Sequence, residues 1–413
     1  MSKGRNRRDK AVKQQYEDFP YPPRNPEDEK KRLIVGSPSN LNELNHYLFA
    51  GKADFSGPFR ALVAGGGTGD AAICLAQQLA DQGNKASVTY LDLSKASRKV
   101  VEERAKVRGL SNMTFYTGSL LDLPSMGLEP FDYIDCCGVL HHLEDPEEGL
   151  GALTSVLNEE GGLGLMLYAT LGRTGVYHVQ DALKVLYGDD PLARQVRQSK
   201  KLVENLPSTN WLVRNPFVGD HKMGEDAAFF DLLLHPRDRS YLVEEIVEFL
   251  ASRNLGVTGF IEPVNYDPVL YIKEETALKR IKKMDMTEKA ALAEKIKGNI
   301  KTHVFYAKKK EYLSTSVAKI APHMVPLLQH EKPAREFASG LKGLKALNVS
   351  FDGQNVSFPL PPRCSEIVAL MDGKRCLSDI QNELSLNWES FRKLFAPLFK
   401  LFNDLNILWL RER

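Results

Sequence analysis

Between Arg60 and Tyr168, short apolar runs alternate with stretches that have the periodicity of helices. Continuous apolar runs of this length are typical of strands in a parallel sheet whose two faces are both covered. The pattern therefore predicts a doubly wound, Rossmann-like α/β domain. Its predicted strands are 61–64, 88–91, 113–117, 133–137 and 163–168, and its predicted helices are 70–80, 94–108 and 146–158, with Asp70 and Ser94 as N-caps.

The pattern continues on both sides of this core. Residues 172–235 are helical and irregular, and we expect them to form an insertion at the sheet edge. Two late strands, 256–262 and 303–307, flank a charged helix near 286–297, so the sheet should have seven strands with the last two as antiparallel partners. A short capped helix is expected within 37–49.

After Lys310 the pattern changes to short elements. Residues 350–360 have the turn chemistry of a hairpin, and three helices and a terminal strand follow. This order predicts a small α+β domain similar to a winged helix. The chain would then divide into an N-terminal tail and cap segment (1–59), a main domain (60–310) and a C-terminal domain (311–413). The last predicted helix has Arg392 and Lys393 as its one basic pair, which disfavours DNA binding.

Composition excludes several classes of protein. The net charge is +2, with 26% charged and 43% hydrophobic residues, so binding of polyanions by bulk charge is not expected. The basic residues 1–13 are expected to be a solvated tail, with a nucleic-acid arm or a transit peptide as alternatives. We find neither a stretch of ~20 apolar residues nor a secretion signal, so we expect a cytoplasmic protein without a membrane span. The five cysteines suggest neither a metal site nor a disulfide.

A glycine-rich turn follows the first predicted strand and precedes the first helix. Its residues are Gly65, Gly66, Gly67, Thr68 and Gly69. Glycines let the backbone approach a ligand, and the helix start offers free amides to an anionic group, although such turns also occur without ligands. The dinucleotide fingerprint needs a third glycine where this chain has Asp70, which disfavours NAD.

An aspartate follows the second predicted strand at the expected distance from the glycine turn. The Asp92 carboxylate is suited to accept both hydroxyl groups of a ribose, which indicates a nucleoside without choosing among nucleosides. The alternative is an ordinary capping aspartate ahead of Ser94.

Five motifs carry a family resemblance. The runs ALVAGGGTG, YLDLS, FYTGSLLDLP, FDYIDCCGVLHHLEDP and GGLGLMLYA resemble the successive motifs of class I S-adenosylmethionine-dependent methyltransferases. The VLHHL stretch is similar to the ubiquinone-biosynthesis-like branch, while QYEDFPYP and LLLHPRDRSY resemble accessory segments of a bacterial subgroup. The resemblance implies transfer of a methyl group from S-adenosyl-L-methionine to an O or N atom, with S-adenosyl-L-homocysteine as product.

The resemblance also implies which residues bind the cofactor. Two positions depart from the family: Val63 and Ser119 stand where acids are common, so affinity would fall or the hydrogen bonds would shift to Asp122 or water. The implied cofactor-binding residues are Gly65, Gly66, Gly67, Thr68, Gly69, Asp92, Leu93, Ser119, Leu120, Cys137, Gly138 and His142.

Candidates for catalysis and acceptor binding are less specific. His141 is a candidate general base, with packing beside His142 as the alternative. Tyr16 and Tyr21 are candidates to close over the sulfonium through their rings, or to pack a terminal arm. Beside Tyr21, the candidate acceptor-binding residues are His235, Arg237, Arg239 and Tyr241, which otherwise form a capping and ion-pair cluster.

The acceptor class stays open in the sequence. The fourth strand lacks the N-P-P-[YF] motif of amide and base N-methyltransferases and has Cys136–Val139 instead, which disfavours methylation of nucleic-acid bases. We expect a small molecule or a peptide or protein side chain as acceptor, and a homodimer is a candidate assembly. The alternatives are a non-catalytic cofactor-binding scaffold, favoured by Val63, and a nicotinamide oxidoreductase, disfavoured by Asp70.

Overall fold

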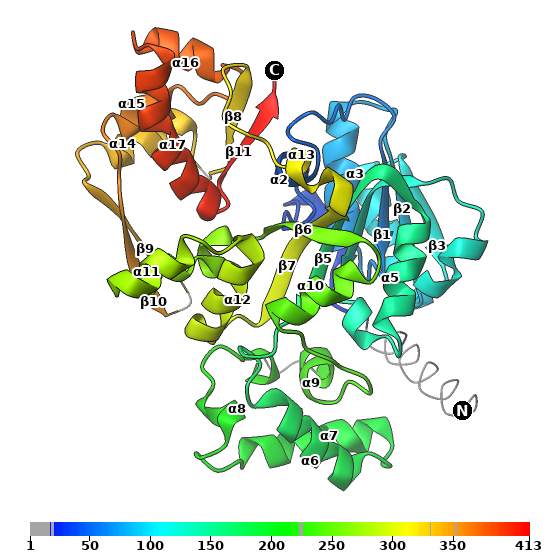
Figure 1. The fold of residues 1–413 in the computed structure, drawn as a ribbon. Coiled ribbons are helices and arrows are strands. Elements are labelled where there is room, and N and C mark those ends of the chain that lie inside the picture. The colour runs from blue at the N-terminus through cyan, green and yellow to red at the C-terminus, as the bar shows by residue number, and fades with distance from the viewer. Residues whose placement is uncertain (1–16, 18–19, 223–225, 331, 352) are drawn as a thin grey trace.

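The computed structural model describes residues 17, 20–222, 226–330, 332–351 and 353–413. Its centre is a seven-stranded sheet in the order β3-β2-β1-β4-β5-β7-β6 (Figure 1). Neighbours from β3 to β5 are parallel, and β7 is antiparallel to both β5 and β6. The predicted Rossmann-like sheet is confirmed. Its strands are β1 (Arg60–Ala64), β2 (Ser87–Asp92), β3 (Met113–Thr117), β4 (Phe131–Cys137), β5 (Leu157–Tyr168), β6 (Leu255–Phe260) and β7 (Thr302–Lys309).

Helices cover both faces of the sheet. The helices α2 (Leu41–Leu48), α3 (Asp70–Gln82) and α4 (Lys95–Arg108) pack on one face. The other face is covered by α5 (Pro146–Ser155), α10 (Val243–Ala251) and α12 (Met286–Lys297). Burial of apolar side chains on both faces explains the unbroken apolar runs of the central strands.

Two local predictions were wrong. The helix predicted for 146–158 ends at Ser155, because Leu157 pairs with Phe131 and so begins β5. Asp70 is not the N-cap of α3. The cap is Gly69, with a φ of +97°, and Asp70 is the first helical residue, so its carboxylate is free for other partners.

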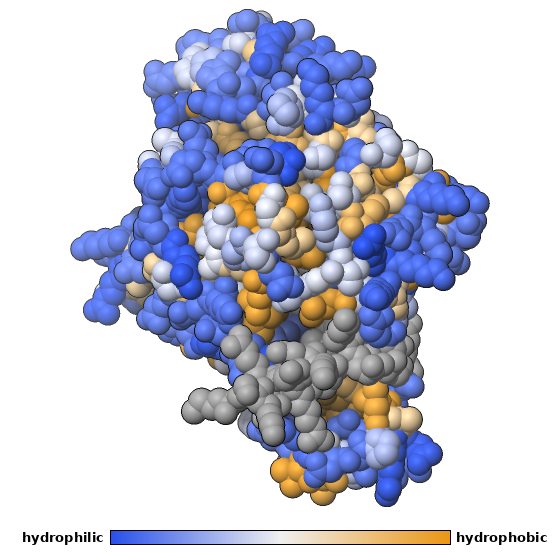
Figure 2. All heavy atoms as spheres, turned by 90° about the vertical axis from the view of Figure 1, so that its right-hand side faces the viewer, coloured by the Kyte–Doolittle hydropathy of each residue, from blue (hydrophilic) through white to orange (hydrophobic). Residues whose placement is uncertain are grey.

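A lobe of four helices follows β5. The helices are α6 (Val176–Tyr187), α7 (Leu192–Glu204), α8 (Trp211–Arg214) and α9 (Asp226–Leu233), which we call the insertion. It has its own apolar core, and Figure 1 shows it below the sheet. Several of its large hydrophobic side chains are exposed, and Figure 2 shows hydrophobic surface at the lower end of the molecule. The exposed side chains are Val185, Leu186, Trp211 and Val213.

The C-terminal part contains the predicted hairpin, three helices and final strand. The final strand β11 (Leu408–Glu412) pairs antiparallel with β8 (Met324–Leu328). The strand β8 was not predicted from the sequence, because Pro326 interrupts its short apolar run. The winged-helix assignment stays a prediction. The remaining elements are α14 (Ala334–Leu341), β9 (Ala346–Phe351), β10 (Gln354–Pro359), α15 (Cys364–Ala369), α16 (Leu377–Glu383) and α17 (Trp388–Asp404), with α11 (Glu275–Ile281) and α13 (Leu313–Ser316) before β8.

A buried histidine joins α2 to β11 and should make stability depend on pH. The Nδ1 atom of His46 accepts a hydrogen bond from Leu410 N (3.2 Å), and burial lowers the pKa of His46 to about 4. The unfolded chain, with a pKa of about 6.5, binds this proton more tightly. Stability should therefore fall as the pH drops from about 6.5 to about 4, by about 1.4 kcal/mol per pH unit from this group.

Urea unfolding of wild type and His46→Gln across this pH range measures the contribution. All other titrating groups are shared by the two proteins, so the difference between their unfolding free energies isolates His46. We expect the variant to lose less stability on acidification. Parallel pH profiles would show that His46 is protonated equally in both states.

Candidate active site

The glycine turn connects β1 to α3, and its backbone conformation and packing require glycine at two positions. Gly65 and Gly69 have φ angles of +76° and +97°. An added Cβ would lie 2.3 Å from a methyl group of Val139 at Gly65, and 2.2 Å from a methyl group of Val101 at Gly69. The amides of Gly65 and Gly66 both donate to Leu91 O, at 2.7 and 3.2 Å. Glycine is therefore required at both positions, because the backbone of the turn packs against these side chains and has left-handed φ angles.

Asp92 lies at the carboxyl end of β2, facing this turn. Its Oδ2 atom accepts a hydrogen bond from Gly67 N (2.8 Å), and its Oδ1 atom accepts one from Ser94 N (2.8 Å). Burial raises the pKa of Asp92, and the side chain remains partly exposed, as does neighbouring Leu93. Asp92 thus connects the glycine turn with the start of α4, where Ser94 is the N-cap.

The segment 20–32, which we call the strap, crosses the glycine turn. Tyr21 O accepts a hydrogen bond from Thr68 N (3.3 Å), and Pro22 O accepts one from Thr68 Oγ1 (2.6 Å). A Cβ at Gly67 would lie 2.6 Å from Tyr21 O. Tyr21 therefore contacts the turn through its backbone. Tyr16 lies outside the described residues, so its assignment stays a prediction.

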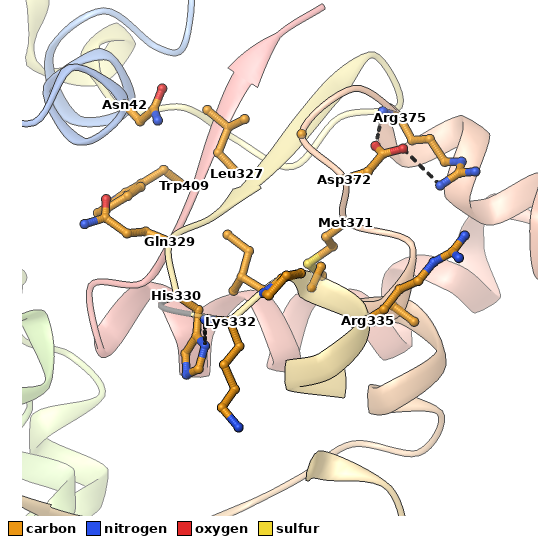
Figure 3. A pocket seen from close by; sticks show the side chains of 15 residues that line it. Asn42, Leu327, Gln329, His330, Lys332, Arg335, Met371, Asp372, Arg375 and Trp409 are labelled. Carbon is orange, nitrogen blue, oxygen red and sulfur yellow. Dashed lines mark hydrogen bonds and ion pairs between the residues drawn. The ribbon is translucent and has the colours of Figure 1, made fainter. Parts of the chain in front are cut away.

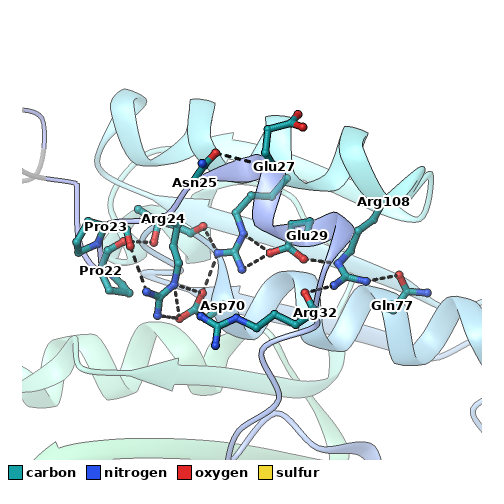
Figure 4. A network of polar contacts seen from close by, with 12 residues as sticks. Pro22, Pro23, Arg24, Asn25, Glu27, Glu29, Arg32, Asp70, Gln77 and Arg108 are labelled. Carbon is teal, nitrogen blue, oxygen red and sulfur yellow. Dashed lines mark hydrogen bonds and ion pairs between the residues drawn. The ribbon is translucent and has the colours of Figure 1, made fainter.

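Charged side chains fasten the strap to α3 and α4 (Figure 4). Arg24 contacts Asp70 at 2.6 Å, and Asp70 also contacts Arg104 at 2.8 Å. Arg104 contacts Glu29 at 2.7 Å, and Glu29 is bonded to Arg108 as well. The side chains of Arg104 and Glu29 are 1% and 3% exposed. Asp70 thus stands where the dinucleotide fingerprint has its third glycine, and its carboxylate binds Arg24 of the strap.

Sequence reasoning missed this network. One signal was available, because Arg104 shares the inward face of α4 with Val101 and Ala105, which are both buried. An arginine on an apolar stripe needs a buried acid as partner. Its partners are distant in sequence, so the pairing could not be read from the residues alone.

Two of the predicted cofactor-binding residues, Ser119 and Leu120, lie at the start of a short 3₁₀ helix, Leu120–Ser125. Ser119 is its N-cap: Ser119 Oγ accepts a hydrogen bond from Leu121 N (3.2 Å), and Asp122 Oδ2 accepts one from Ser119 N (3.1 Å). Leu120 is buried. The Ser119 hydroxyl therefore caps this 3₁₀ helix, and the Asp122 carboxylate binds the backbone amide of Ser119.

The end of β4 contributes Cys137 and Gly138. Gly138 has a φ of +75°, and its amide donates to Met166 O (3.2 Å). Burial raises the pKa of the Cys137 thiol well above its ordinary value. Behind it lies Asp135, which accepts a hydrogen bond from Ser39 Oγ (2.8 Å) and has its pKa raised by burial to about 6. Sequence reasoning missed Asp135, although an acid inside an apolar strand is itself a signal.

Two stacked ring pairs follow β4. The His141 ring stacks on Tyr168 at 3.9 Å, and the His142 ring stacks on His235 at 3.8 Å. His142 Nδ1 donates to Arg237 O (2.9 Å). His141 is fully buried, and neither of its ring nitrogens has a hydrogen-bond partner among the described residues. Burial lowers the pKa of His141 well below its ordinary value, so the ring is neutral near pH 7.

A cluster of polar side chains packs against the Tyr168 ring on the side of the insertion. The Arg173 guanidinium lies 3.7 Å from the centre of the Tyr168 ring and pairs with Asp238 at 3.2 Å. Tyr168 donates its hydroxyl hydrogen to Asp231 (3.0 Å). The sequence did not indicate this group, because Asp231 of α9 and Asp238 of the loop before α10 lie far along the chain from Tyr168 and Arg173.

The remaining predicted acceptor residues are Arg237, Arg239 and Tyr241. Arg237 pairs with Glu144, and Arg239 pairs with Glu245, each at 3.5 Å. The Arg239 guanidinium also lies 4.5 Å from the ring centre of Tyr241, which is fully buried. In this geometry both arginines already have carboxylate partners, and their role in acceptor binding stays a prediction.

The described residues include no group of three or more His, Cys, Asp or Glu that could hold a metal ion. Nor do they form a helix with the length and apolar character needed to cross a membrane.

Comparisons with known proteins bear on the fold and on the family of this domain. Residues 62–163 match the family model of a methyltransferase domain. An uncharacterized protein from Synechococcus sp. (strain ATCC 27144 / PCC 6301 / SAUG 1402/1) is 30% identical over 308 residues, which cover 72% of this chain and 70% of the relative. The fold is similar to that of PKMT2 from Rickettsia typhi, with a TM-score of 0.63, 15% identity and coverage of 92% of this chain and 76% of that one. A complex of PKMT2 with AdoHcy gives a TM-score of 0.60, also at 15% identity, over 90% of this chain and 76% of that one. The chain therefore contains a methyltransferase domain and has the fold of class I S-adenosylmethionine-dependent methyltransferases.

Proposed function

We propose that the chain methylates an oxygen or nitrogen atom of an acceptor that binds beside His141, between the end of β5 and the insertion. The observation that carries the proposal is one contact: Val139, two residues before His141, packs directly on Gly65 of the glycine turn. The predicted cofactor-binding turn, Gly65–Gly69, and the stacked rings of His141 and Tyr168 are therefore adjacent. Both lie at the carboxyl edge of the sheet, where open α/β folds bind ligands.

Each part of the site has a defined task in this proposal. The cofactor supplies an electrophilic methyl group on a sulfonium. Asp92 accepts the ribose hydroxyls, and the Gly65–Gly69 backbone allows the cofactor to lie against the sheet. The strap covers the turn from outside and excludes water. Neutral His141 accepts a hydrogen bond from the acceptor O–H or N–H group and takes its proton as the new bond forms.

Transfer of a radiolabelled methyl group into fractionated cell extract tests the proposal. Purified protein and labelled S-adenosylmethionine should label one extract fraction. Label in macromolecules would favour a peptide or protein side chain, and label in small metabolites would favour a small molecule. Cofactor binding without any labelled product would instead support the non-catalytic scaffold, for which Val63 is the sequence argument.

Substitution of His141 should separate catalysis from cofactor binding. His141→Ala is expected to lower the rate of labelling by about 10²–10⁴-fold, the usual contribution of a positioned acid or base. Affinity for S-adenosylhomocysteine should stay within about threefold of wild type, because His141 is assigned to the acceptor and not to the cofactor.

The matched control is His178→Ala, which removes an exposed histidine of α6. It should label the extract at the wild-type rate. If His141→Ala folds, binds S-adenosylhomocysteine and labels as fast as this control, His141 has no part in proton transfer.

A further inference from the structure

A cavity of about 700 Å³ lies in the C-terminal part of the chain (Figure 3). Asn42, Gln329 and Arg375 are among the described residues that line it, whereas His141 and Tyr168 are not. Figure 1 shows the C-terminal elements at the top of the molecule and the insertion at the bottom. The cavity is therefore separate from the proposed acceptor site, and the geometry of that site depends on the side chains packed around His141.

Ring packing orients His141. Neither nitrogen of its ring has a hydrogen-bond partner among the described residues. The ring stacks on Tyr168 with 3.9 Å between the ring centres and an angle of 30°, and it makes an edge contact with His142 at 4.3 Å. His142, by contrast, is held by its hydrogen bond to Arg237 O (2.9 Å). Because a base must lie within hydrogen-bond reach of the proton that it takes, the position of Tyr168 decides what His141 can reach.

The ring of Tyr168 is itself held between two groups. The Arg173 guanidinium lies over it, 3.7 Å from the ring centre. Two groups this close to one ring centre cannot share a face without overlapping, so Arg173 and His141 lie on opposite faces of Tyr168. The Tyr168 hydroxyl donates to Asp231 (3.0 Å), which fixes the far end of the ring.

Arg173 carries a buried charge. Its side chain is 6% exposed, and that of its partner Asp238, at 3.2 Å, is 1% exposed. Its Nε atom donates to the Tyr177 hydroxyl of α6 (3.2 Å), so the guanidinium joins β5 to the insertion. Burial of a guanidinium costs free energy that an apolar side chain packed on the same ring would not. The charge therefore indicates a role beyond packing.

The charge acts on His141 across the Tyr168 ring. Burial lowers the pKa of His141 well below its ordinary value, and the charges of His142 and Arg173 lower it further. Loss of the Arg173 charge should therefore raise that pKa, so that the ring binds a proton at higher pH. The titratable and charged side chains that surround His141, directly or through one contact, are His142, Tyr168, Arg173, Asp231, His235 and Asp238.

We propose that Arg173 is a positioning residue for methyl transfer, which fixes the Tyr168 ring and through it holds the His141 ring toward the acceptor. The inference rests on the proposed function, in which His141 takes the proton of the acceptor. Arg173 acts through Tyr168 and is assigned neither to the acceptor nor to the cofactor. A displacement of a catalytic group by about 1 Å can cost about 10²-fold in rate, so the packing of Tyr168 bears directly on the reaction.

The pH profile of methyl transfer tests the proposal. Wild type and variants of the full chain are assayed between about pH 5 and pH 9 with radiolabelled S-adenosylmethionine and the extract fraction that wild type labels. In Arg173→Met the maximal rate should fall about tenfold or more, and the acid limb should move to higher pH by about one unit, because His141 loses both its support and a nearby cation. Arg173→Lys keeps the charge without the planar guanidinium, so it should restore the acid limb but not the full rate.

The matched control is Arg214→Met, which removes an exposed arginine 5.7 Å from the ring centre of Trp211. It should label as wild type does at every pH. Affinity for S-adenosylhomocysteine should stay within about threefold of wild type in all variants. If Arg173→Met unfolds, a variant that also carries Asp238→Asn removes both buried charges and should show the same loss of rate.

Two results would overturn the proposal. One is a rate and a pH profile of Arg173→Met equal to those of wild type. The other is an equal loss of rate in Arg173→Met and Arg173→Lys with an unchanged acid limb, which would show that Arg173 only stabilises the fold. In both results wild type still labels the extract, which distinguishes them from failure of the proposed function, where wild type itself labels nothing and the basis of both proposals is lost.

Discussion

Replacement of Arg104 by methionine should lower the free energy of unfolding by about 3–5 kcal/mol, the usual loss when one partner of a buried ion pair is removed. Arg104 is almost fully buried and contacts both Glu29 (2.7 Å) and Asp70 (2.8 Å). Methionine keeps much of the side-chain volume but leaves each carboxylate with one cation fewer. Urea unfolding at neutral pH measures the loss.

The matched control is Arg98→Met on the same helix. Arg98 pairs with Glu102 at 2.7 Å, but these side chains are 35% and 41% exposed. Its loss should stay below about 1 kcal/mol, as for other exposed pairs. Equal losses in the two variants would mean that the buried network contributes no more than a surface ion pair. The strap would then need another explanation for its position.

Replacement of Asp92 by asparagine should weaken the binding of S-adenosylhomocysteine by about 10- to 100-fold. Asparagine has nearly the same shape but carries no charge, and the loss of one charged hydrogen-bond acceptor costs about 1–3 kcal/mol. The substitution also tests the two hydrogen bonds that Asp92 accepts from Gly67 N and Ser94 N. Isothermal titration of the variant and wild type gives the ratio of dissociation constants.

The control for this prediction is Asp54→Asn, which changes a fully exposed aspartate that bonds Ser56. It has the same chemistry and no contact with the glycine turn, so its affinity should match that of wild type. Comparable affinities of Asp92→Asn and this control would limit the role of Asp92 to its hydrogen bonds with Gly67 N and Ser94 N.

Local patterns in the sequence were sufficient to predict the strands of the sheet and the position of the glycine turn. A buried strand must be apolar, and the left-handed φ angles at Gly65 and Gly69 admit glycine with little strain, so both features are visible in neighbouring residues. The same holds for Asp92, which follows its strand directly.

Contacts between distant residues were not predictable in this way. Asp70 looked like a helix cap, and its actual partners are Arg24, 46 residues earlier, and Arg104, 34 residues later. β8 and β11 pair across the whole C-terminal part, so neither strand indicates the other. The pairing of Arg173 with Asp238, 65 residues later, depends on how the loop after β5 packs against the loop before α10.

Isothermal titration of the wild-type chain with S-adenosylhomocysteine tests the central claim most directly. If the glycine turn Gly65–Gly69 and Asp92 bind the adenosyl group, the titration should show one binding site per chain and competition by S-adenosylmethionine. Absence of heat, together with an unchanged unfolding temperature in the presence of excess ligand, would contradict the account.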